Sequence, residues 1–339
     1  MSTTSATTMD AVRIHPAPQA SPPYSASNPA PPSALVLEHV SVPALKPGHV
    51  LVRVHAATVT RDELSWPESY THESRIPGYD FAGVVAKVHE NDDSKFKPGD
   101  QVFAMNDIHN GASWAEFTVV KTDHLALKPQ TLSFEEAATV PMSALTAWQA
   151  LFVQAGLPEP DFGRPQSRDN GTVLVTGASG AVGAYVVQLA AAAGLHVVAT
   201  SGSNEKNGDF LRSLGASEVV EYQDIASSGR AFGTIVDTVG GDPLEQSWLL
   251  VEDQGTIVTV NSSSFDFSGK HAPPGKERVK AIFFILEPSG RHLEDIARGL
   301  DLGALKAYVA YTFPLADAVA AYEKASGRLG RPGKVVLSI

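Results

Sequence analysis

The sequence predicts an α/β protein of two domains, a β-rich domain followed by a doubly wound parallel sheet. Three observations lead to this prediction. The chain has 339 residues, more than the roughly 100–200 residues usual for one domain. Short strand-like runs fill residues 34–128, whereas strands and helices alternate after residue 172. The segment 173–194, VLVTGASGAVGAYVVQLAAAAG, joins a β-branched run to regularly spaced glycines and an alanine-rich helix, a pattern typical of a nucleotide-binding βα turn.

Composition disfavours several classes of function. A net charge of -11 repels nucleic acid and anionic membranes. The absence of cysteine removes disulfides, cysteine nucleophiles and thiolate zinc sites. The histidines form neither an i, i+4 pair nor an HExxH run, and Ser179 lies in GASGA instead of GxSxG, which disfavours a histidine-built metal site and a serine hydrolase. Without a membrane-spanning apolar run or a secretory signal, we expect a cytoplasmic protein, with a transit peptide as the alternative.

The first domain is predicted over residues 9–142. Residues 1–8 are expected to be a disordered lead-in, and residues 16–33 a Pro-rich loop too poor in large apolar residues to pack a core. Ser133 and Glu136 form a capping-box pattern that begins a helix, and a second helix is expected over 144–155, ending at Gly156. The remaining elements are strands of an antiparallel, closed or nearly closed barrel, at 11–15, 34–40, 49–59, 81–88, 100–105 and 114–120.

The second domain is predicted over residues 143–286 as a parallel sheet with helices on both faces, because near-continuously apolar strands alternate with helices. Its strands are expected at 172–176, 196–200, 217–222, 234–240, 255–261 and 279–286, and its helices at 181–193, 208–214 and 243–251. Residues 287–339 contain two further helical segments, at 293–302 and 315–324, and a closing strand. We expect this tail to return to the first domain.

The glycine turn predicts a dinucleotide site. Gly177, Gly180 and Gly183 follow a strand and open a helix, in the spacing GxxGxxG. Gly180 would let the backbone approach a pyrophosphate, and Gly183 would let the helix lie close to the strand. Free N–H groups and the helix dipole then favour phosphate binding at four residues, Ser179, Gly180, Ala181 and Val182. The alternative is a tight turn that holds no ligand.

The end of the next strand predicts the type of dinucleotide. An acidic residue there usually binds the ribose 2′-hydroxyl of NAD, whereas hydroxyls and a cation suit the 2′-phosphate of NADP. This strand is followed by Ser201, Ser203 and Lys206, which favours NADPH over NADH. Two alternatives remain open: Glu205 repels the phosphate or pairs with Lys206, and Lys206 is an ordinary surface lysine.

From Met9 to Ile339 the chain resembles the zinc-independent quinone oxidoreductase branch of the medium-chain dehydrogenase/reductase superfamily, which includes ζ-crystallin. The resemblance rests on several motifs in one order, among them GHVLVRVHAATVTRDELSW, IPGYDFAGVV, EEAATVPMSALTAWQALF, VLVTGASGAVG, VDTVGG and GRPGKVVLSI. It implies a GroES-like β-barrel catalytic domain, a Rossmann domain, NADPH as the coenzyme and a possible homodimer.

The resemblance also implies the chemistry. Zinc-dependent relatives carry a histidine ligand where this chain has Tyr79, and their other ligand positions need cysteines. Without zinc no group stabilises an alkoxide, so we expect hydride transfer to a small electrophile, a quinone or an α,β-unsaturated carbonyl compound. The resemblance places Thr60 as a hydrogen-bond donor, Arg61 as an anion stabiliser and Tyr79 as a proton donor. The alternatives are a surface ion pair between Arg61 and Glu63, and a buried structural tyrosine.

The resemblance further implies coenzyme contacts that could equally be core residues: Thr146, Tyr222, Val239, Gly240, Val260 and Phe283. Trp66, Tyr70 and Trp114 are candidates for an aromatic substrate wall, with the core as the alternative for Trp114. Three other functions remain open: a pathway-specific enoyl reductase of secondary metabolism, a non-catalytic, crystallin-like NADPH-binding protein, and a methyltransferase with the same type of glycine turn.

Overall fold

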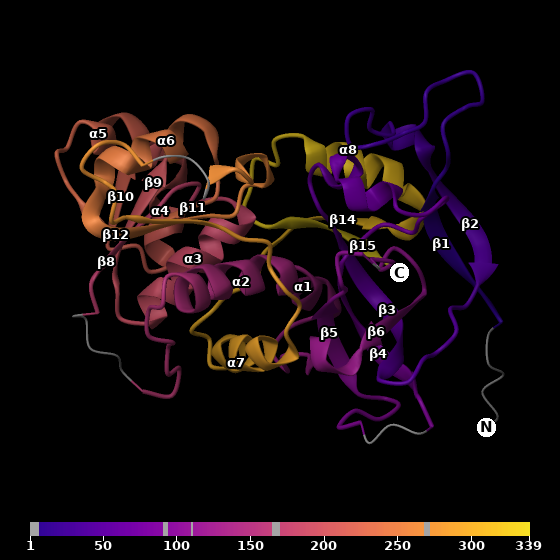
Figure 1. The fold of residues 1–339 in the computed structure, drawn as a ribbon. Coiled ribbons are helices and arrows are strands. Elements are labelled where there is room, and N and C mark those ends of the chain that lie inside the picture. Colours follow the sequence, from indigo (N-terminus) through magenta and orange to yellow (C-terminus); the bar gives the residue numbers. More distant parts are fainter. Residues whose placement is uncertain (1–6, 91–93, 110, 165–169, 268–271) are drawn as a thin grey trace. The chain divides into compact units, whose positions relative to one another are not determined.

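A computed structural model describes residues 7–90, 94–109, 111–164, 170–267 and 272–339. The chain forms two compact units (Figure 1). The first comprises Met1–Met142, Pro288–Ala297 and Ala307–Ile339, and the second comprises Ser143–Glu287 and Arg298–Lys306. Most of the predicted lead-in lies outside the described residues, and the first strand already begins at Thr8. The fold class predicted from the sequence, α/β with a β-rich domain and a parallel-sheet domain, is confirmed.

The first unit is built on a seven-stranded sheet in the order β14-β15-β3-β4-β5-β7, with β6 paired to β3. The pairs are antiparallel as predicted, except that β14 and β15 run parallel. Among the described residues no pairing joins β14 to β7, so the ladder is not a closed ring. The strands are β3 (His49–Val59), β4 (Asp80–Val88), β5 (Gln101–Met105), β6 (Phe117–Lys121), β7 (Leu125–Leu127), β14 (Val309–Pro314) and β15 (Lys334–Ser338).

A two-stranded ribbon of β1 (Thr8–Ile14) and β2 (Leu35–Ser41) completes the strands of this unit, with Ile14 opposite Leu35. Val12 and Leu35 join its main hydrophobic core. The Pro-rich stretch between the two strands contributes one isolated bridge, Ser25 to Asn28, and a 3-10 turn, η1 (Pro32–Ala34). Its composition therefore predicted the absence of a long strand or helix correctly.

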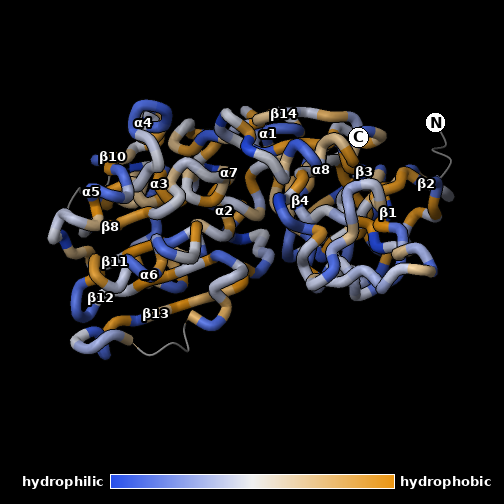
Figure 2. The backbone as a smooth tube through the Cα atoms, turned by 90° about the horizontal axis from the view of Figure 1, so that it is seen from above, coloured by the Kyte–Doolittle hydropathy of each residue, from blue (hydrophilic) through white to orange (hydrophobic). Residues whose placement is uncertain are grey.

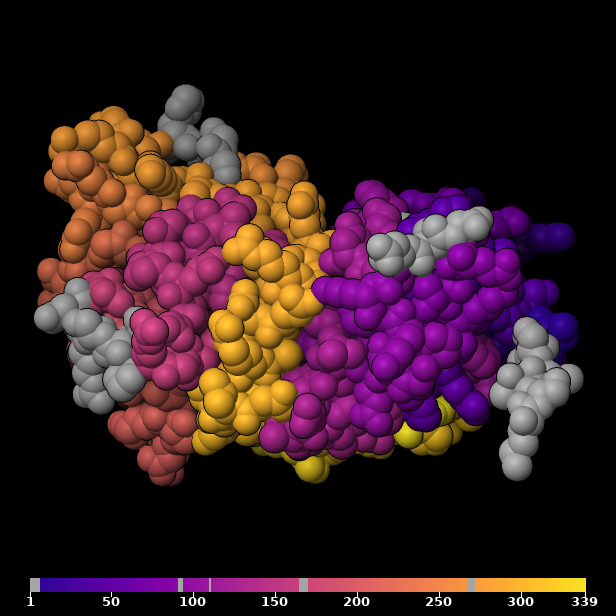
Figure 3. Space-filling view, turned by 90° about the horizontal axis from the view of Figure 1, so that it is seen from below, coloured from indigo at the N-terminus to yellow at the C-terminus, as the bar shows by residue number. Residues whose placement is uncertain are grey.

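One helix of the first unit begins at a local capping signal. Both hydrogen bonds of the predicted capping box are present at α1 (Phe134–Ala138). The helix predicted over 144–155 begins earlier, as α2 (Pro141–Trp148), and continues as a π-helix, η5 (Gln149–Gln154). Towards the C-terminus lie α7 (Gly290–Asp301), which is exposed along one side (Figure 3), the 3-10 turn η8 (Leu315–Asp317) and α8 (Ala318–Ser326). The remaining 3-10 turns among the described residues are η2 (Glu63–Ser65), η3 (Pro67–Tyr70), η4 (Thr122–His124) and, in the second unit, η6 (Ser262–Ser264).

The second unit is a six-stranded, wholly parallel sheet in the order β10-β9-β8-β11-β12-β13. Its central strands are apolar (Figure 2), as both-sided burial requires. Successive strands move in one direction from β8 to β10 and in the other from β11 to β13, so the order reverses between β8 and β11. The strands are β8 (Thr172–Val175), β9 (His196–Ser201), β10 (Glu218–Glu221), β11 (Phe232–Asp237), β12 (Val251–Thr259) and β13 (Lys280–Phe283).

The helices cover this sheet as right-handed crossovers require. α3 (Ala181–Ala192) packs against β8 and β9, and α4 (Asn204–Ser213) packs against β9 and β10. α6 (Gly241–Leu250) packs against β11 and β12, and α5 (Tyr222–Ala226) is short. Because the crossovers run in opposite directions on the two sides of the reversal, a constant right hand puts α3 and α6 on opposite faces.

One boundary prediction in this unit was wrong. The helix expected over 208–214 begins at Asn204, because the Ser203 side chain accepts a hydrogen bond from the backbone N–H of Lys206 and caps it.

The segment Arg298–Lys306, expected in the first domain with the rest of the tail, belongs to the second unit. Its Lys306 N–H donates to the buried Gln188 side chain of α3 at 2.7 Å.

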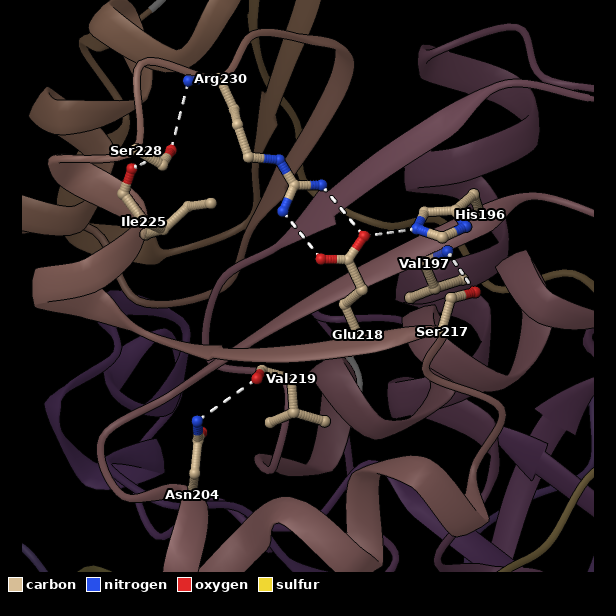
Figure 4. A network of polar contacts seen from close by, with 9 residues as sticks. All are labelled: His196, Val197, Asn204, Ser217, Glu218, Val219, Ile225, Ser228 and Arg230. Carbon is tan, nitrogen blue, oxygen red and sulfur yellow. Dashed lines mark hydrogen bonds and ion pairs between the residues drawn. The ribbon is translucent and has the colours of Figure 1, made fainter.

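The amino ends of the strands are held by an ion cluster around Glu218 (Figure 4). Arg230 donates two hydrogen bonds to this carboxylate, at 2.8 and 3.2 Å, and His196 lies 2.7 Å from it. The hydrogen bond from Arg230 lowers the pKa of Glu218 below its ordinary value. The cluster ties the starts of β9 and β10 to the segment before β11, so the opposite edge of the sheet is left for ligand contacts.

Gly183 sets the distance between α3 and the turn after β8. A side-chain carbon at this position would lie 2.2 Å from the Gly177 carbonyl oxygen and 2.8 Å from Cα of Ala178. Both obstacles are backbone atoms, which cannot move aside without opening the turn. The sequence-based role of Gly183, close packing of helix and strand, is therefore confirmed.

We predict that Gly183→Ala destabilises the protein by about 1–3 kcal/mol, because the added methyl group overpacks against backbone. Denaturant unfolding followed by circular dichroism measures the change. Gly202→Ala is the matched control, since a side-chain carbon at Gly202 meets nothing within 4 Å. Equal stability of the two variants would contradict this account of Gly183.

Candidate functional site

The carboxyl ends of β8 and β11, where the strand order reverses, form the candidate ligand-binding edge. In open parallel sheets this position is where ligands bind, because the crossovers leave in opposite directions and open a crevice. Asp237, the last residue of β11, is fully buried there and accepts hydrogen bonds from the Gly240 N–H and the Thr259 hydroxyl, each at 2.9 Å. It also accepts one from the Thr176 hydroxyl, which directly follows β8. One carboxylate thus fixes the ends of three strands.

The glycine turn lies at this edge. Gly177 has a φ of +63°, and a side-chain carbon there would lie 2.3 Å from the Thr238 hydroxyl, so only glycine fits. Its N–H donates to the Tyr222 hydroxyl at 2.8 Å. Ser179 and Gly180 are exposed, and α3 begins directly after them. This exposed turn lies at the start of a 12-residue helix, where backbone N–H groups without helical partners can bind an anion.

The structure brings the predicted coenzyme residues of the second unit to the same edge of one sheet. Each of them follows or ends a parallel strand, and carboxyl ends of parallel strands share an edge. Ser201 ends β9, Tyr222 follows β10 and Phe283 ends β13. The others lie in the segments after β8, β9, β11 and β12: Ser179, Gly180, Ala181, Val182, Ser203, Lys206, Val239, Gly240 and Val260. Thr146 is buried in α2, which precedes all the strands of the parallel sheet in the sequence.

Hydroxyl and amide groups surround the start of α4. The Ser201 hydroxyl donates to the Ser203 carbonyl at 2.9 Å and accepts from the Asn207 amide at 3.1 Å. Lys206 is exposed in the first turn of the helix, and the described chain places no ion pair between it and Glu205. The Lys206 side chain is therefore exposed to solvent, three residues after the helix cap Ser203.

In the first unit, Thr60 and Arg61 directly follow β3. Thr60 is half-buried, and its hydroxyl contacts the Met142 sulfur at 3.8 Å. The alternative ion pair between Arg61 and Glu63 is wrong, because the exposed Arg61 lies 3.6 Å from Asp62 instead. Asp62 has a φ of +61°, and this left-handed residue turns the following Glu63 inward.

Tyr79 is only 1% exposed, and its ring packs against Trp66 at 5.6 Å. The guanidinium of Arg75 lies 3.4 Å from its hydroxyl. Burial raises the pKa of this hydroxyl above its ordinary value, so it stays protonated. These surroundings favour the buried structural tyrosine over the proton donor. Trp114 is also a core residue, fully buried with its indole N–H donating to the Thr58 carbonyl at 2.9 Å.

Glu63 is a buried carboxyl group that the sequence did not single out. It is 1% exposed, and one carboxyl oxygen accepts from the Gly78 N–H at 2.6 Å. The other oxygen has no hydrogen-bond partner in the described residues. Burial raises the pKa of Glu63 to about 7. No sequence signal distinguishes this glutamate from its exposed neighbours, because a left-handed Asp62 turns it inward.

Asp80 forms a second buried polar centre. It accepts hydrogen bonds from the Thr58 hydroxyl at 2.9 Å and the Met142 N–H at 2.8 Å, and it pairs with the buried Lys334. The only sequence signal was its place in the motif PGYD. Within the residues that the structure describes, no group of three or more histidine, cysteine, aspartate or glutamate side chains is placed to hold a metal ion.

Two family models match the chain. The "Alcohol dehydrogenase GroES-like domain" covers residues 46–130, and "Zinc-binding dehydrogenase" covers residues 214–337. A "Probable zinc-binding oxidoreductase, mitochondrial" from Arthroderma benhamiae is 37% identical over 91% of this chain and 94% of that protein. The chain belongs to the medium-chain dehydrogenase/reductase superfamily. It is an oxidoreductase of the quinone-oxidoreductase-like type, as the sequence motifs predicted.

Other relatives also match this chain over most of its length. The "Chloroplast envelope quinone oxidoreductase homolog" of Arabidopsis thaliana is 30% identical over 85% of this chain and 90% of that protein. Among solved structures, the quinone oxidoreductase from Coxiella burnetii superposes with a TM-score of 0.81 over 98% of this chain and 99% of that one, at 24% identity. At that identity the superposition confirms the fold: GroES-like and Rossmann domains.

The zinc named in one family description does not match the residues of this oxidoreductase. The chain has no cysteine, and a buried Tyr79 beside Arg75 stands where the resemblance places a histidine ligand. A guanidinium at this point repels a cation. Separately, no helix in the described ranges is long and apolar enough to cross a membrane.

We predict that Glu63 makes the protein less stable as the pH rises from about 4.5 to about 7. An unfolded chain ionises this group near its ordinary value of 4.5, whereas the folded chain keeps the proton up to about 7. Unfolding therefore releases a proton in this window, which lowers the free energy of unfolding by about 3 kcal/mol across it. Glu63→Gln should lack this decline when urea unfolding is measured at several pH values.

Glu323→Gln, at an exposed position of α8, is the control and should follow the wild-type pH dependence. If Glu63→Gln and the wild type lose stability in parallel between these pH values, the buried carboxyl group titrates normally and the prediction is wrong.

Proposed function

We propose that the protein is an NADPH-dependent reductase that transfers a hydride to a quinone or an α,β-unsaturated carbonyl compound without zinc. The observation that carries this proposal is the glycine turn at the reversal point of the parallel sheet, with Lys206 and two serines beside it. Relatives support a nicotinamide coenzyme, since one from Homo sapiens, 29% identical over 86% of this chain, is named "NAD(P)H oxidoreductase RTN4IP1, mitochondrial".

The preference for NADPH rests on the groups after β9. Lys206 supplies a cation, and Ser201 and Ser203 supply hydroxyls, where a 2′-phosphate would lie. Tyr222, whose hydroxyl holds the Gly177 N–H, presents its phenol on the same side. Two carboxylates lie at this turn: Glu205 is exposed, so it can point into solvent, and Glu221 accepts a hydrogen bond from the Asn204 N–H at 2.8 Å.

When bound, NADPH supplies the hydride, which moves to an electron-poor carbon of the substrate. The residues of this chain then stabilise the negative charge that develops on the substrate oxygen. Thr60 offers a hydroxyl and Arg61 a guanidinium, both in the exposed or half-buried segment after β3. Among the described residues, Arg61 is held only by an exposed contact with Asp62, so it can turn towards an anion.

The absence of zinc in this proposal rests on the residues. Alcohol oxidation by a zinc enzyme needs protein ligands that hold the metal. This chain has neither cysteines nor, in its described part, a suitable cluster of other ligands. Reduction of an already polarised acceptor needs only hydrogen-bond donors, which Thr60 and Arg61 supply.

The proposal also includes a homodimer and a cytoplasmic location, whereas several relatives carry "mitochondrial" or "chloroplastic" in their names. The substrate is a small molecule in either case. A pathway-specific enoyl reductase is the second candidate; it shares the coenzyme and differs in the acceptor.

A panel of acceptors tests the reaction. With NADPH, the protein should reduce quinones or small enones at a rate measured by the absorbance of the reduced nicotinamide, and added chelator should leave the rate unchanged. Turnover of enoyl thioesters alone would favour the pathway-specific reductase. Binding of NADPH without reduction of any acceptor would favour the non-catalytic alternative, and binding of S-adenosylmethionine in its place would favour the methyltransferase.

We predict that Lys206→Ala weakens the binding of NADPH by about 5–30-fold, because one charge-assisted phosphate contact of ~1–2 kcal/mol is lost. The affinity for NADH should be almost unchanged. Isothermal titration calorimetry of both coenzymes measures the difference. Arg212→Ala removes a positive charge from the same helix, where Arg212 pairs with Asp209 at 3.3 Å, and should change neither affinity. Equal weakening of both coenzymes in Lys206→Ala would make this lysine an ordinary surface residue.

A further inference from the structure

A surface cavity of about 390 Å³ lies in the first unit, beside the β1–β2 ribbon. Its lining combines three kinds of residue: cationic or imidazole side chains, serines, and small apolar side chains. No carboxylate lines it, although the chain as a whole has a net charge of -11. The lining residues are Arg13, His72, Arg75, Ser41, Ser74, Val40, Ile76 and Ala112.

Arg13 is only partly used by its protein contacts. Its Nε–H donates to the Ser74 carbonyl at 2.7 Å, and Nη1 donates to Glu38 at 3.2 Å. A guanidinium has five N–H donors, so three remain for a ligand. The side chain is 33% exposed, which leaves these donors accessible from the cavity.

Arg75 brings a second positive charge, and no carboxylate contacts it within the described ranges. Its Nη groups donate to neutral acceptors: the Glu68 and Ile108 carbonyls and the Thr71 and Tyr79 hydroxyls. Glu63 lies close enough to feel this charge but makes no contact with it. A buried guanidinium with only neutral partners favours an anion in the adjoining space.

The walls of the cavity are held in an unusual backbone conformation. Ser74 has a φ of +53° and Ala112 a φ of +75°, two of the three left-handed residues other than glycine in the described ranges. Such residues cost free energy, and surrounding contacts must hold them. At Ser74 this contact is the hydrogen bond from Arg13. The same arginine thus shapes the cavity and offers the free donors.

We propose that this cavity binds a small organic carboxylate. The carboxylate lies against Arg13, with the Ser41 and Ser74 hydroxyls as further donors, because a guanidinium matches the two oxygens of a carboxylate. The apolar part of the ligand lies on Val40, Ile76 and Ala112. The volume exceeds that of an inorganic anion, and three apolar side chains offer nothing to a bare phosphate.

Benzoate, acetate and inorganic phosphate are the probes, each titrated at constant ionic strength into the full chain without coenzyme and followed by calorimetry and by NMR. Benzoate should bind at one saturable site, about tenfold more tightly than acetate, because its ring buries apolar area. Absence of saturable binding overturns the proposal. Phosphate binding as tight as that of benzoate also overturns it, since the cavity would then be a simple patch of positive charge.

Two variants remove the site in different ways. Arg13→Gln should weaken the binding of benzoate at least about tenfold, because the charge-assisted contact is lost. Ser41→Asp keeps Arg13 and places a competing carboxylate in the cavity, at the exposed end of β2. It should weaken the binding of benzoate as strongly. This second variant tests the site even where Arg13→Gln alters the fold.

Arg53→Gln is the matched control, since Arg53 is exposed on β3 and does not line the cavity. It should keep the wild-type affinity within about twofold. Weakening by Arg53→Gln equal to that by Arg13→Gln overturns the proposal. These titrations contain no coenzyme, so their failure leaves the proposed reductase untouched, and failure of NADPH binding leaves this site untouched.

Discussion

The ligand edge of the second unit depends on the hydrogen bonds that converge on the Asp237 carboxylate. Parallel strands pair along their lengths, but nothing in the ladder controls how their ends are arranged. Asp237 supplies this control by accepting from Thr176 after β8, from Gly240 after β11 and from Thr259 at the end of β12. A fully buried carboxylate needs such donors, and each donor is placed by the carboxylate in return. The edge is therefore arranged before a ligand arrives.

The two edges of this sheet divide their tasks. At the amino ends, Arg230 and His196 contact Glu218 in a partly exposed cluster that joins strands and helps to hold the fold. At the carboxyl ends, Lys206 and Glu205 are exposed, the Glu221 carboxylate accepts from the Asn204 N–H at the start of α4, and Asp237 is sealed inside. This edge therefore carries a lysine and two carboxylates beside its backbone and hydroxyl donors.

Local sequence patterns predicted most of the fold. The alternation of apolar residues in His49–Val59 and the glycine spacing after Val175 each involve residues close together in the sequence. The strand and the turn could therefore be predicted from the sequence alone. The start of α4 was missed because Ser203 caps it five residues before Gly208, where the helix was predicted to begin. Among the candidate site residues, those that follow the strands of the parallel sheet could be grouped from the sequence, because parallel topology alone brings their ends to one edge.

Groups defined by distant contacts could not be predicted. Lys334 and Asp80 are 254 positions apart, and neither residue type suggests burial by itself. Glu63 follows the exposed Asp62, yet the left-handed conformation of Asp62 turns it into the core. The alternative ion pair between Arg61 and Glu63 is absent for the same reason: a turn conformation, not the spacing, decides which way each side chain points.

The pairing of β15 with β3 has a consequence for how the protein is made. Ribosomes release the chain from its amino end, and domains usually fold as they emerge. Here β3 and Asp80 emerge early but wait for β14, β15 and Lys334, which come from the last part of the chain. The parallel sheet has left the ribosome long before then. The later-encoded unit can therefore fold first, while the earlier one stays incomplete, with an unpaired strand edge and an uncompensated acid, until translation is almost finished.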